Sequence, residues 1–306
     1  MISRLNFVLR VAGATLLLSL NTLVHVAPLL AVALLKLLTP PASRPRRWFD
    51  HLLMAIAASW IDFNSWMIDR LTDTRIEVSG LPEPDPSGQM LVICNHQSWV
   101  DIPVLQKLFN RRLPLLRFFL KSQLIWVPLL GLAWWALDFP FMKRHTRAQI
   151  QRRPELADRD VQATRAACAK FRKLPVAVVN FVEGTRFRPA RHAAQASPYR
   201  HLLKPRAGGV AFTLDAMGEA IERLIDVTIV YPQGRPRMVD LFSNRVREIR
   251  VAVHSHPIPD WLRGGDYLND EDFRRRVREW INELWQAKDD TASRLLESSD
   301  RRGQTT

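Results

Sequence analysis

The stretch that decides the fold runs Met90-Leu91-Val92-Ile93-Cys94-Asn95-His96-Gln97-Ser98-Trp99-Val100-Asp101, with Pro103 shortly after. Its first five residues form an uninterrupted apolar run, which predicts a buried strand. The polar residues that follow predict a turn that opens toward a helix. Strands that alternate with helices along the rest of the chain predict an α/β fold, with a mixed sheet flanked by helices.

His96 and Asp101 lie five positions apart and can meet if the first helical turn folds between them. The carboxylate would accept a hydrogen bond from one imidazole nitrogen and leave the other free to take a proton from a substrate hydroxyl. The same spacing also arises by chance. A capping Asp beside a surface His is the alternative interpretation.

A second polar stretch, Phe181-Val182-Glu183-Gly184-Thr185-Arg186, also follows an apolar, strand-like run at 176–179. Between the two lies Leu137-Asp138-Phe139-Pro140-Phe141-Met142-Lys143-Arg144, and Val227-Thr228-Ile229-Val230-Tyr231-Pro232 comes later. In this order the four stretches resemble the motifs of the glycerolipid acyltransferases, specifically the 1-acylglycerol-3-phosphate acyltransferases. The resemblance covers roughly residues 75 to 260.

The resemblance implies an enzyme that moves an acyl chain from a thioester to the free hydroxyl of a lysophospholipid, most directly lysophosphatidate. In the family's His-x4-Asp motif, His96 would be the general base and Asp101 would orient it. The acyl donor would be acyl-coenzyme A or acyl carrier protein, with no cofactor and no covalent acyl-enzyme. Cys94 offers a thiol near His96, but a buried structural thiol is the simpler interpretation.

The same resemblance implies a binding site for the acceptor. Arg186 would hold the phosphate, since a guanidinium can pair with phosphate bidentately, and Arg144 would assist. Gly184 would let the backbone approach a ligand, and Thr185 belongs to the same motif. Glu183 would lock Arg186 or bind a glycerol hydroxyl.

Three positions depart from the family pattern. Lys143 stands where an acidic residue is usual, and Val182 and Thr228 stand where prolines are usual. The form of the last motif resembles the longer branch of the family, which includes relatives of lysocardiolipin acyltransferase. The acceptor therefore stays open between lysophosphatidate, lysophosphatidylglycerol and lysocardiolipin.

The first 40 residues predict a membrane anchor. No charged residue interrupts Val11 to Leu35, and a helix of about 25 residues spans about 37 Å, more than the ~30 Å hydrocarbon core. Pro28 could kink it. Basic residues on both sides fit either a spanning helix, with the C-terminal side in the cytoplasm, or a helix pair lying in one leaflet.

The amino-acid composition indicates which kinds of molecule the protein binds. The 306 residues carry a net charge of +14, which indicates an anionic partner such as a lipid surface; nucleic acid is disfavoured because no binding motif is present. Cys94 and Cys168 are too few for a disulfide framework. His254-Ser255-His256 has a metal-binding spacing without an accompanying cluster, so we expect no metal.

We expect five regions along the chain. They are an anchor at 1–40, a linker and an interfacial or packed helix at 41–73, a catalytic domain at 74–260, an amphipathic helix at 261–297 and a disordered tail at 298–306. The resemblance places the protein in the bacterial inner membrane, with the catalytic domain on the cytoplasmic side. A catalytically inactive membrane scaffold and a His/Asp metallohydrolase are the rival hypotheses.

Overall fold

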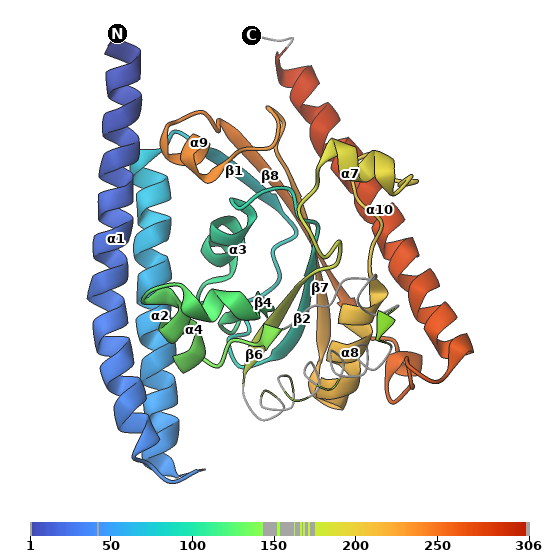
Figure 1. The fold of residues 1–306 in the computed structure, drawn as a ribbon. Helices are drawn as coiled ribbons and strands as arrows, with labels where there is room; N and C mark the ends of the chain where they lie inside the picture. The colour runs from blue at the N-terminus through green and yellow to red at the C-terminus, as the bar shows by residue number, and fades with distance from the viewer. Residues whose placement is uncertain are drawn as a thin grey trace.

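The computed structural model describes residues 2–41, 43–142 and 175–303, together with residues 152, 153, 162, 166, 168 and 171. The described strands form a six-stranded sheet in the order β1-β8-β7-β2-β6-β3 (Figure 1). Strands β7 and β8 are antiparallel, and the other neighbouring pairs are parallel. The predicted mixed α/β sheet is confirmed. Its strands are β1 (Arg75–Ser79), β2 (Gln89–Cys94), β3 (Leu116–Phe118), β6 (Val176–Phe181), β7 (Arg223–Val230) and β8 (Glu248–Pro257).

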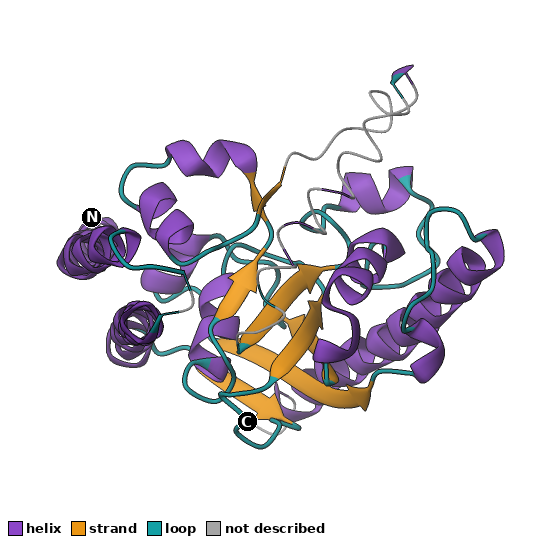
Figure 2. Ribbon diagram, turned by 90° about the horizontal axis from the view of Figure 1, so that it is seen from below, coloured by secondary structure: helices purple, strands orange, loops and turns teal. Residues whose placement is uncertain are grey.

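The central strands are apolar because both faces of the sheet are covered. One face packs against α1 (Ile2–Leu37), α2 (Arg44–Leu71), α3 (Asp101–Phe109), α4 (Leu130–Ala136) and α9 (Met238–Phe242). The opposite face packs against α8 (Ala207–Met217) and α10 (Glu271–Gly303). Figure 2 shows helices on both sides of the sheet. Because β2, β6 and β7 are parallel, their carboxyl ends meet at one edge, where the polar motifs follow.

Helices α1 and α2 lie side by side as an antiparallel pair (Figure 1). Asn21 joins them, since its side-chain amide donates to Asn64 Oδ1 at 2.9 Å and to the Trp60 carbonyl at 3.2 Å. Helix α1 continues through Pro28. Its stretch Leu5–Leu37 is long and apolar enough to cross a membrane, and 22% of its most apolar window is buried.

The face of α1 that meets the protein is buried along much of its length. Ala14, Val26 and Leu29 belong to the same core as residues of the sheet. Helix α2 lies against α3 and contributes Leu53 and Met67 to that core. The helix pair is therefore packed lengthwise on the α/β domain.

Helix α10 crosses the opposite face of the sheet. Trp285 is fully buried there, and its indole N–H donates to the Leu203 carbonyl at 3.0 Å. Lys288 forms a buried ion pair with Asp226 of β7 and donates to the Val227 carbonyl at 2.6 Å. This helix thus completes the core of the α/β domain.

One predicted boundary was wrong. The helix α10 continues to Gly303, whereas we expected disorder from Ser298; the sequence from 298 to 302 contains no Gly or Pro that would end a helix. The stretch at 116–121 forms two strands, β3 and β4 (Leu120–Lys121), and β4 pairs with β5 (Phe141–Met142) in a separate two-stranded sheet.

The remaining described elements are short. Residues 124–135 form the end of the 3-10 helix η1 (Ser122–Trp126) and most of α4. The others are α7 (Pro189–Ala194), η2 (Gly218–Ala220) and η3 (Asp260–Leu262).

Candidate active site

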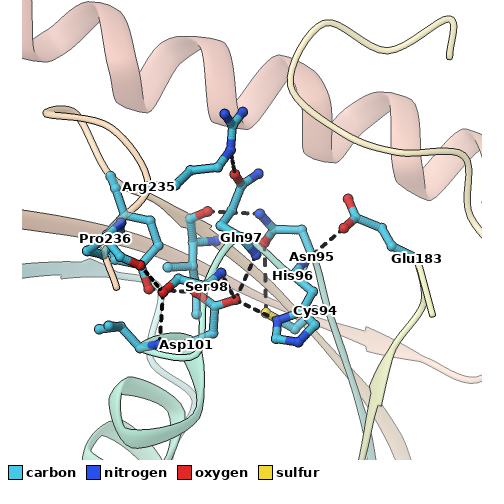
Figure 3. Close-up of polar contacts among 12 residues, drawn as sticks. Cys94, Asn95, His96, Gln97, Ser98, Asp101, Glu183, Arg235 and Pro236 are labelled. Atoms are coloured by element: carbon cyan, nitrogen blue, oxygen red, sulfur yellow. Dashed lines mark hydrogen bonds and ion pairs between the residues drawn. The ribbon is translucent and has the colours of Figure 1, made fainter. Parts of the chain in front are cut away.

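The structure brings His96 and Asp101 together at the carboxyl edge of the sheet (Figure 3). His96 follows β2, and Asp101 is the first residue of α3. His96 Nδ1 lies 2.8 Å from Asp101 Oδ2. The same oxygen accepts the backbone N–H groups of Gln97 at 2.7 Å and Ser98 at 2.9 Å. The Asp101 carboxylate therefore both closes the 96–101 turn and orients the His96 ring.

The second carboxylate oxygen of Asp101 accepts the hydroxyl of Tyr231, which follows β7, at 2.5 Å. Burial, reinforced by the Asp101 charge, raises the pKa of Tyr231 well above its usual value, so the phenol stays a donor. Asp101 is fully buried, and an ionised carboxylate only accepts. The proton between His96 and Asp101 is therefore assigned to Nδ1.

The His96 ring lies against Phe181, with centroids 4.0 Å apart and planes inclined by 15°. Its side chain is 13% exposed. Nε2 makes no hydrogen bond to any residue that the structure describes. With Nδ1 protonated, this nitrogen has a free lone pair that can accept a proton from a bound hydroxyl.

Neighbouring polar groups fix the catalytic turn to the sheet. Asn95 donates to the Ile229 carbonyl at 2.8 Å and accepts the Ile229 N–H at 2.9 Å, so its side chain extends the ladder between β2 and β7. The hydroxyl of Ser98 donates to the Pro236 carbonyl and accepts the Val100 N–H. Cys94 is fully buried, and burial raises the pKa of its thiol well above the usual value, as befits a structural thiol.

Glu183 has a different position from the one predicted. It is fully buried, and its two oxygens accept the backbone N–H groups of His96 at 3.2 Å and Leu203 at 3.1 Å. Figure 3 shows the contact with His96. It makes no ion pair with Arg186 in the part of the chain that the structure describes. Burial raises its pKa to about 8, opposed by the two backbone donors. The Glu183 side chain thus joins its own motif to the backbone of the His96 motif.

The rest of that motif forms a tight turn. Gly184 has a φ of +68°, which a residue without Cβ adopts freely, and its N–H donates to the Phe181 carbonyl at 2.8 Å. Thr185 accepts a hydrogen bond from Arg191. The Arg186 guanidinium lies 4.7 Å from the centroid of the Trp99 ring, inside the His96–Asp101 turn. The turn therefore brings a cation next to the turn that holds His96.

Arg144 lies outside the described residues, but Arg235 is a nearby cation that our sequence reasoning missed. Its Nε donates to Gln97 Oε1, and its guanidinium lies 3.7 Å from the Phe187 ring centroid. Phe187 in turn donates its N–H to the His96 carbonyl at 2.7 Å. Arg235 lies three residues after the Tyr231-Pro232 motif, and this position in the sequence could have identified it as a residue of the site.

The two histidines with metal-binding spacing lie on β8 and not at the catalytic edge. The rings of His254 and His256 have centroids 6.3 Å apart. Among the residues described, no group of three or more His, Cys, Asp or Glu side chains could hold a metal ion.

Comparison with known proteins agrees with this geometry. The family model described as Acyltransferase matches residues 75–232. The mouse 1-acyl-sn-glycerol-3-phosphate acyltransferase epsilon is 22% identical over 71% of this chain and 60% of its own length. The zebrafish lysocardiolipin acyltransferase 1 is 26% identical over 84% of this chain and 64% of its own length. The chain thus spans less than two thirds of these relatives.

A solved structure shares the fold. The 1-acyl-sn-glycerophosphate acyltransferase PlsC from Thermotoga maritima superposes with a TM-score of 0.55 at 16% identity, over 93% of this chain and 97% of that one. The family match covers more than half of the chain and contains His96, Asp101 and the 183–186 turn. The chain belongs to the acyltransferase family.

Proposed function

We propose that the protein transfers an acyl chain from an acyl thioester to the free hydroxyl of lysophosphatidate and so forms phosphatidate. The observation that carries the proposal is the His96–Asp101 pair, in which Nδ1 is held at 2.8 Å and Nε2 is free of described partners. Such a pair is suited to activating an alcohol. The family membership supports the reaction class.

In the proposed reaction, His96 Nε2 takes the proton of the acceptor hydroxyl as its oxygen attacks the thioester carbonyl. The carbon–oxygen ester bond forms, the carbon–sulfur bond breaks, and the thiolate leaves with the proton returned from His96. Asp101 holds the ring and stabilises the transient imidazolium. General-base catalysis of this kind contributes roughly 10²–10⁴-fold to the rate.

Two arginines support an anionic acceptor. Arg186 rests on Trp99 and Arg235 on Phe187, and both aromatic residues belong to or contact the His96 turn. Arg186 makes no hydrogen bond to a described residue, so its donors are available. We assign both guanidinium groups to the acceptor phosphate, since two planar donors match a dianion.

We further propose that the α1–α2 pair lies in one leaflet of the membrane. Helix α1 packs lengthwise on the domain through Ala14, Val26 and Leu29, while its outer face exposes leucines. A helix crossing the bilayer in this position would carry the charged catalytic domain into the hydrocarbon core. By the family resemblance alone, we assign the membrane to the bacterial inner membrane and the domain to its cytoplasmic face.

The test is acyl transfer from oleoyl-coenzyme A to lysophosphatidate by detergent-purified protein. We expect phosphatidate from the wild type and none above background from His96→Ala. The exposed His51 of α2 provides the matched control, and His51→Ala should retain wild-type activity. Full activity in His96→Ala would refute the base assignment.

A second acceptor class remains a candidate because of the relatives. The zebrafish and chicken lysocardiolipin acyltransferases match 84% and 82% of this chain. The mouse 1-acyl-sn-glycerol-3-phosphate acyltransferase epsilon matches 71% of it. The same assay with lysophosphatidylglycerol and lysocardiolipin, and with acyl carrier protein as donor, separates these possibilities. Activity with none of them would favour a membrane scaffold.

A further inference from the structure

The segment around α4 exposes large apolar side chains to solvent. Trp126 of η1 is 84% exposed, and Leu132 and Trp135 of α4 are 51% and 50% exposed. Leu129, in the turn between them, is 38% exposed. We name these four residues the α4 knuckle. A tryptophan with five sixths of its surface in water is unusual for a protein that meets only water, since burial of such a ring is favourable.

The knuckle is held in place by the protein beneath it. Ala133 and Ala136, on the other side of α4, are buried in the core that includes the sheet. The backbone of Leu129 has a φ of +63°, a region that leucine rarely adopts. At Gly131 a Cβ would lie 2.0 Å from the Ile125 carbonyl oxygen, so only glycine permits this close turn. The apolar side chains therefore cannot turn inward without rebuilding the segment.

The knuckle is a neighbour of the proposed anchor. Helix α4 packs against α1 (Figure 1), and α1 presents its own exposed leucines, among them Leu20, at 53% exposure, and Leu34, at 63%. The knuckle and this face of α1 thus belong to adjoining elements. Tryptophan and leucine together are typical of surfaces that enter the membrane–water interface.

A second contact would strengthen the orientation that the α1–α2 pair provides. The two antiparallel helices contact the bilayer along a strip parallel to their axes, and such a strip resists rotation of the domain about those axes only weakly. A contact to one side of that strip fixes the rotation. It would therefore fix the direction in which the His96 edge of the sheet faces.

We propose that the α4 knuckle inserts into the same bilayer leaflet as α1 and sets the rotation of the catalytic domain on the membrane. The occupant is lipid, because the knuckle adjoins the proposed lipid-facing surface of α1 and is apolar. The inference rests on the proposed anchoring by α1 but concerns different residues.

The test is the depth of single fluorescent labels on the full-length protein in phosphatidylethanolamine–phosphatidylglycerol vesicles. Labels are attached at Trp126→Cys, at Leu20→Cys as the anchor control, and at Arg278→Cys on the exposed face of α10 as the aqueous control. The native Cys94 and Cys168 are buried. We expect lipids with a nitroxide on the acyl chain to quench the labels at 126 and 20, and aqueous iodide to quench the label at 278.

Each outcome decides between the proposals. If lipid quenches the label at 20 and only iodide quenches the label at 126, the insertion of the α4 knuckle is refuted and the anchoring by α1 is supported. Lipid quenching at neither position would overturn both, whatever the enzymatic activity.

A functional readout complements the depth measurement. Trp126→Ser removes a ring that touches little protein, so folding should persist. We expect a several-fold loss of transfer to a vesicle-embedded acceptor and an unchanged rate with a short-chain, water-soluble acceptor. Equal rates with wild type on vesicles would contradict the proposed role in orientation.

Discussion

Replacing Asp101 by Asn tests how the carboxylate serves His96. Asp101 Oδ2 accepts from His96 Nδ1, from Gln97 N and from Ser98 N, while Oδ1 accepts from the Tyr231 hydroxyl. An asparagine can keep its oxygen at the Oδ2 position and direct its amide N–H groups to the Tyr231 oxygen, which has lone pairs to accept them. The tautomer with hydrogen on Nδ1 is then preserved, and only the negative charge is lost.

The magnitude follows from the charge alone. A carboxylate within hydrogen-bond distance stabilises a neighbouring cation by about 1.4–4 kcal/mol. Losing that stabilisation of the transient imidazolium lowers the rate by about 10–10³-fold. We therefore expect Asp101→Asn to reduce kcat by this factor, with a KM for the acceptor close to that of the wild type.

The assay is continuous release of the coenzyme A thiol from oleoyl-coenzyme A in detergent micelles. Asp69→Asn, at an exposed surface pair with Lys107, is the matched control and should leave kcat unchanged. A wild-type kcat for Asp101→Asn would refute the role of the charge. Complete loss, equal to that of His96→Ala, would instead refute the argument that the tautomer survives.

Three further predictions concern buried groups. Tyr231→Phe removes a hydrogen bond to a charged acceptor and should lower the free energy of unfolding by about 1.5–3 kcal/mol, as urea denaturation in detergent would show. Burial raises the pKa of Glu183 to about 8 from 4.5. The contribution of Glu183 to the free energy of unfolding is therefore full below pH 4.5 and is lost as the pH rises toward 8. The midpoint of urea denaturation should fall between these pH values for the wild type, and should fall less for Glu183→Gln. Lys288→Met leaves Asp226 buried and unpaired and should cost about 3–5 kcal/mol, much of it recovered in the double variant with Asp226→Leu; a single variant as stable as the wild type would contradict this.

Local patterns predicted much of the site because they are encoded over a few residues. The apolar runs before His96 and Glu183 became β2 and β6, and the motifs became turns at their carboxyl ends. The spacing of His96 and Asp101 needs one helical turn to close, which is a local event. The failure at Ser298 was also local, since its polar composition fits a solvated helix as well as a disordered tail.

The partners of the site could not be predicted in the same way. Glu183 was expected to lock Arg186 or to bind a glycerol hydroxyl. In the structure β2 pairs in parallel with β6, and the Glu183 carboxylate accepts from the backbone N–H groups of His96 and Leu203. Tyr231 stands 130 residues from Asp101 in the chain. Nothing in the local sequence around either residue specifies that their side chains meet.

The sequence by itself determined the type of chemistry, because the motifs carry the histidine, the carboxylate and the arginine within short stretches, and it determined an apolar N-terminal helix. The tertiary structure alone decided which groups hold the histidine, that Arg235 joins Arg186 near it, and that α1 lies along the domain with α4 beside it. The physical reason is the range of the interactions. Turns and apolar runs depend on neighbours in sequence, whereas hydrogen bonds across strands and helix packing depend on the order of strands in the sheet.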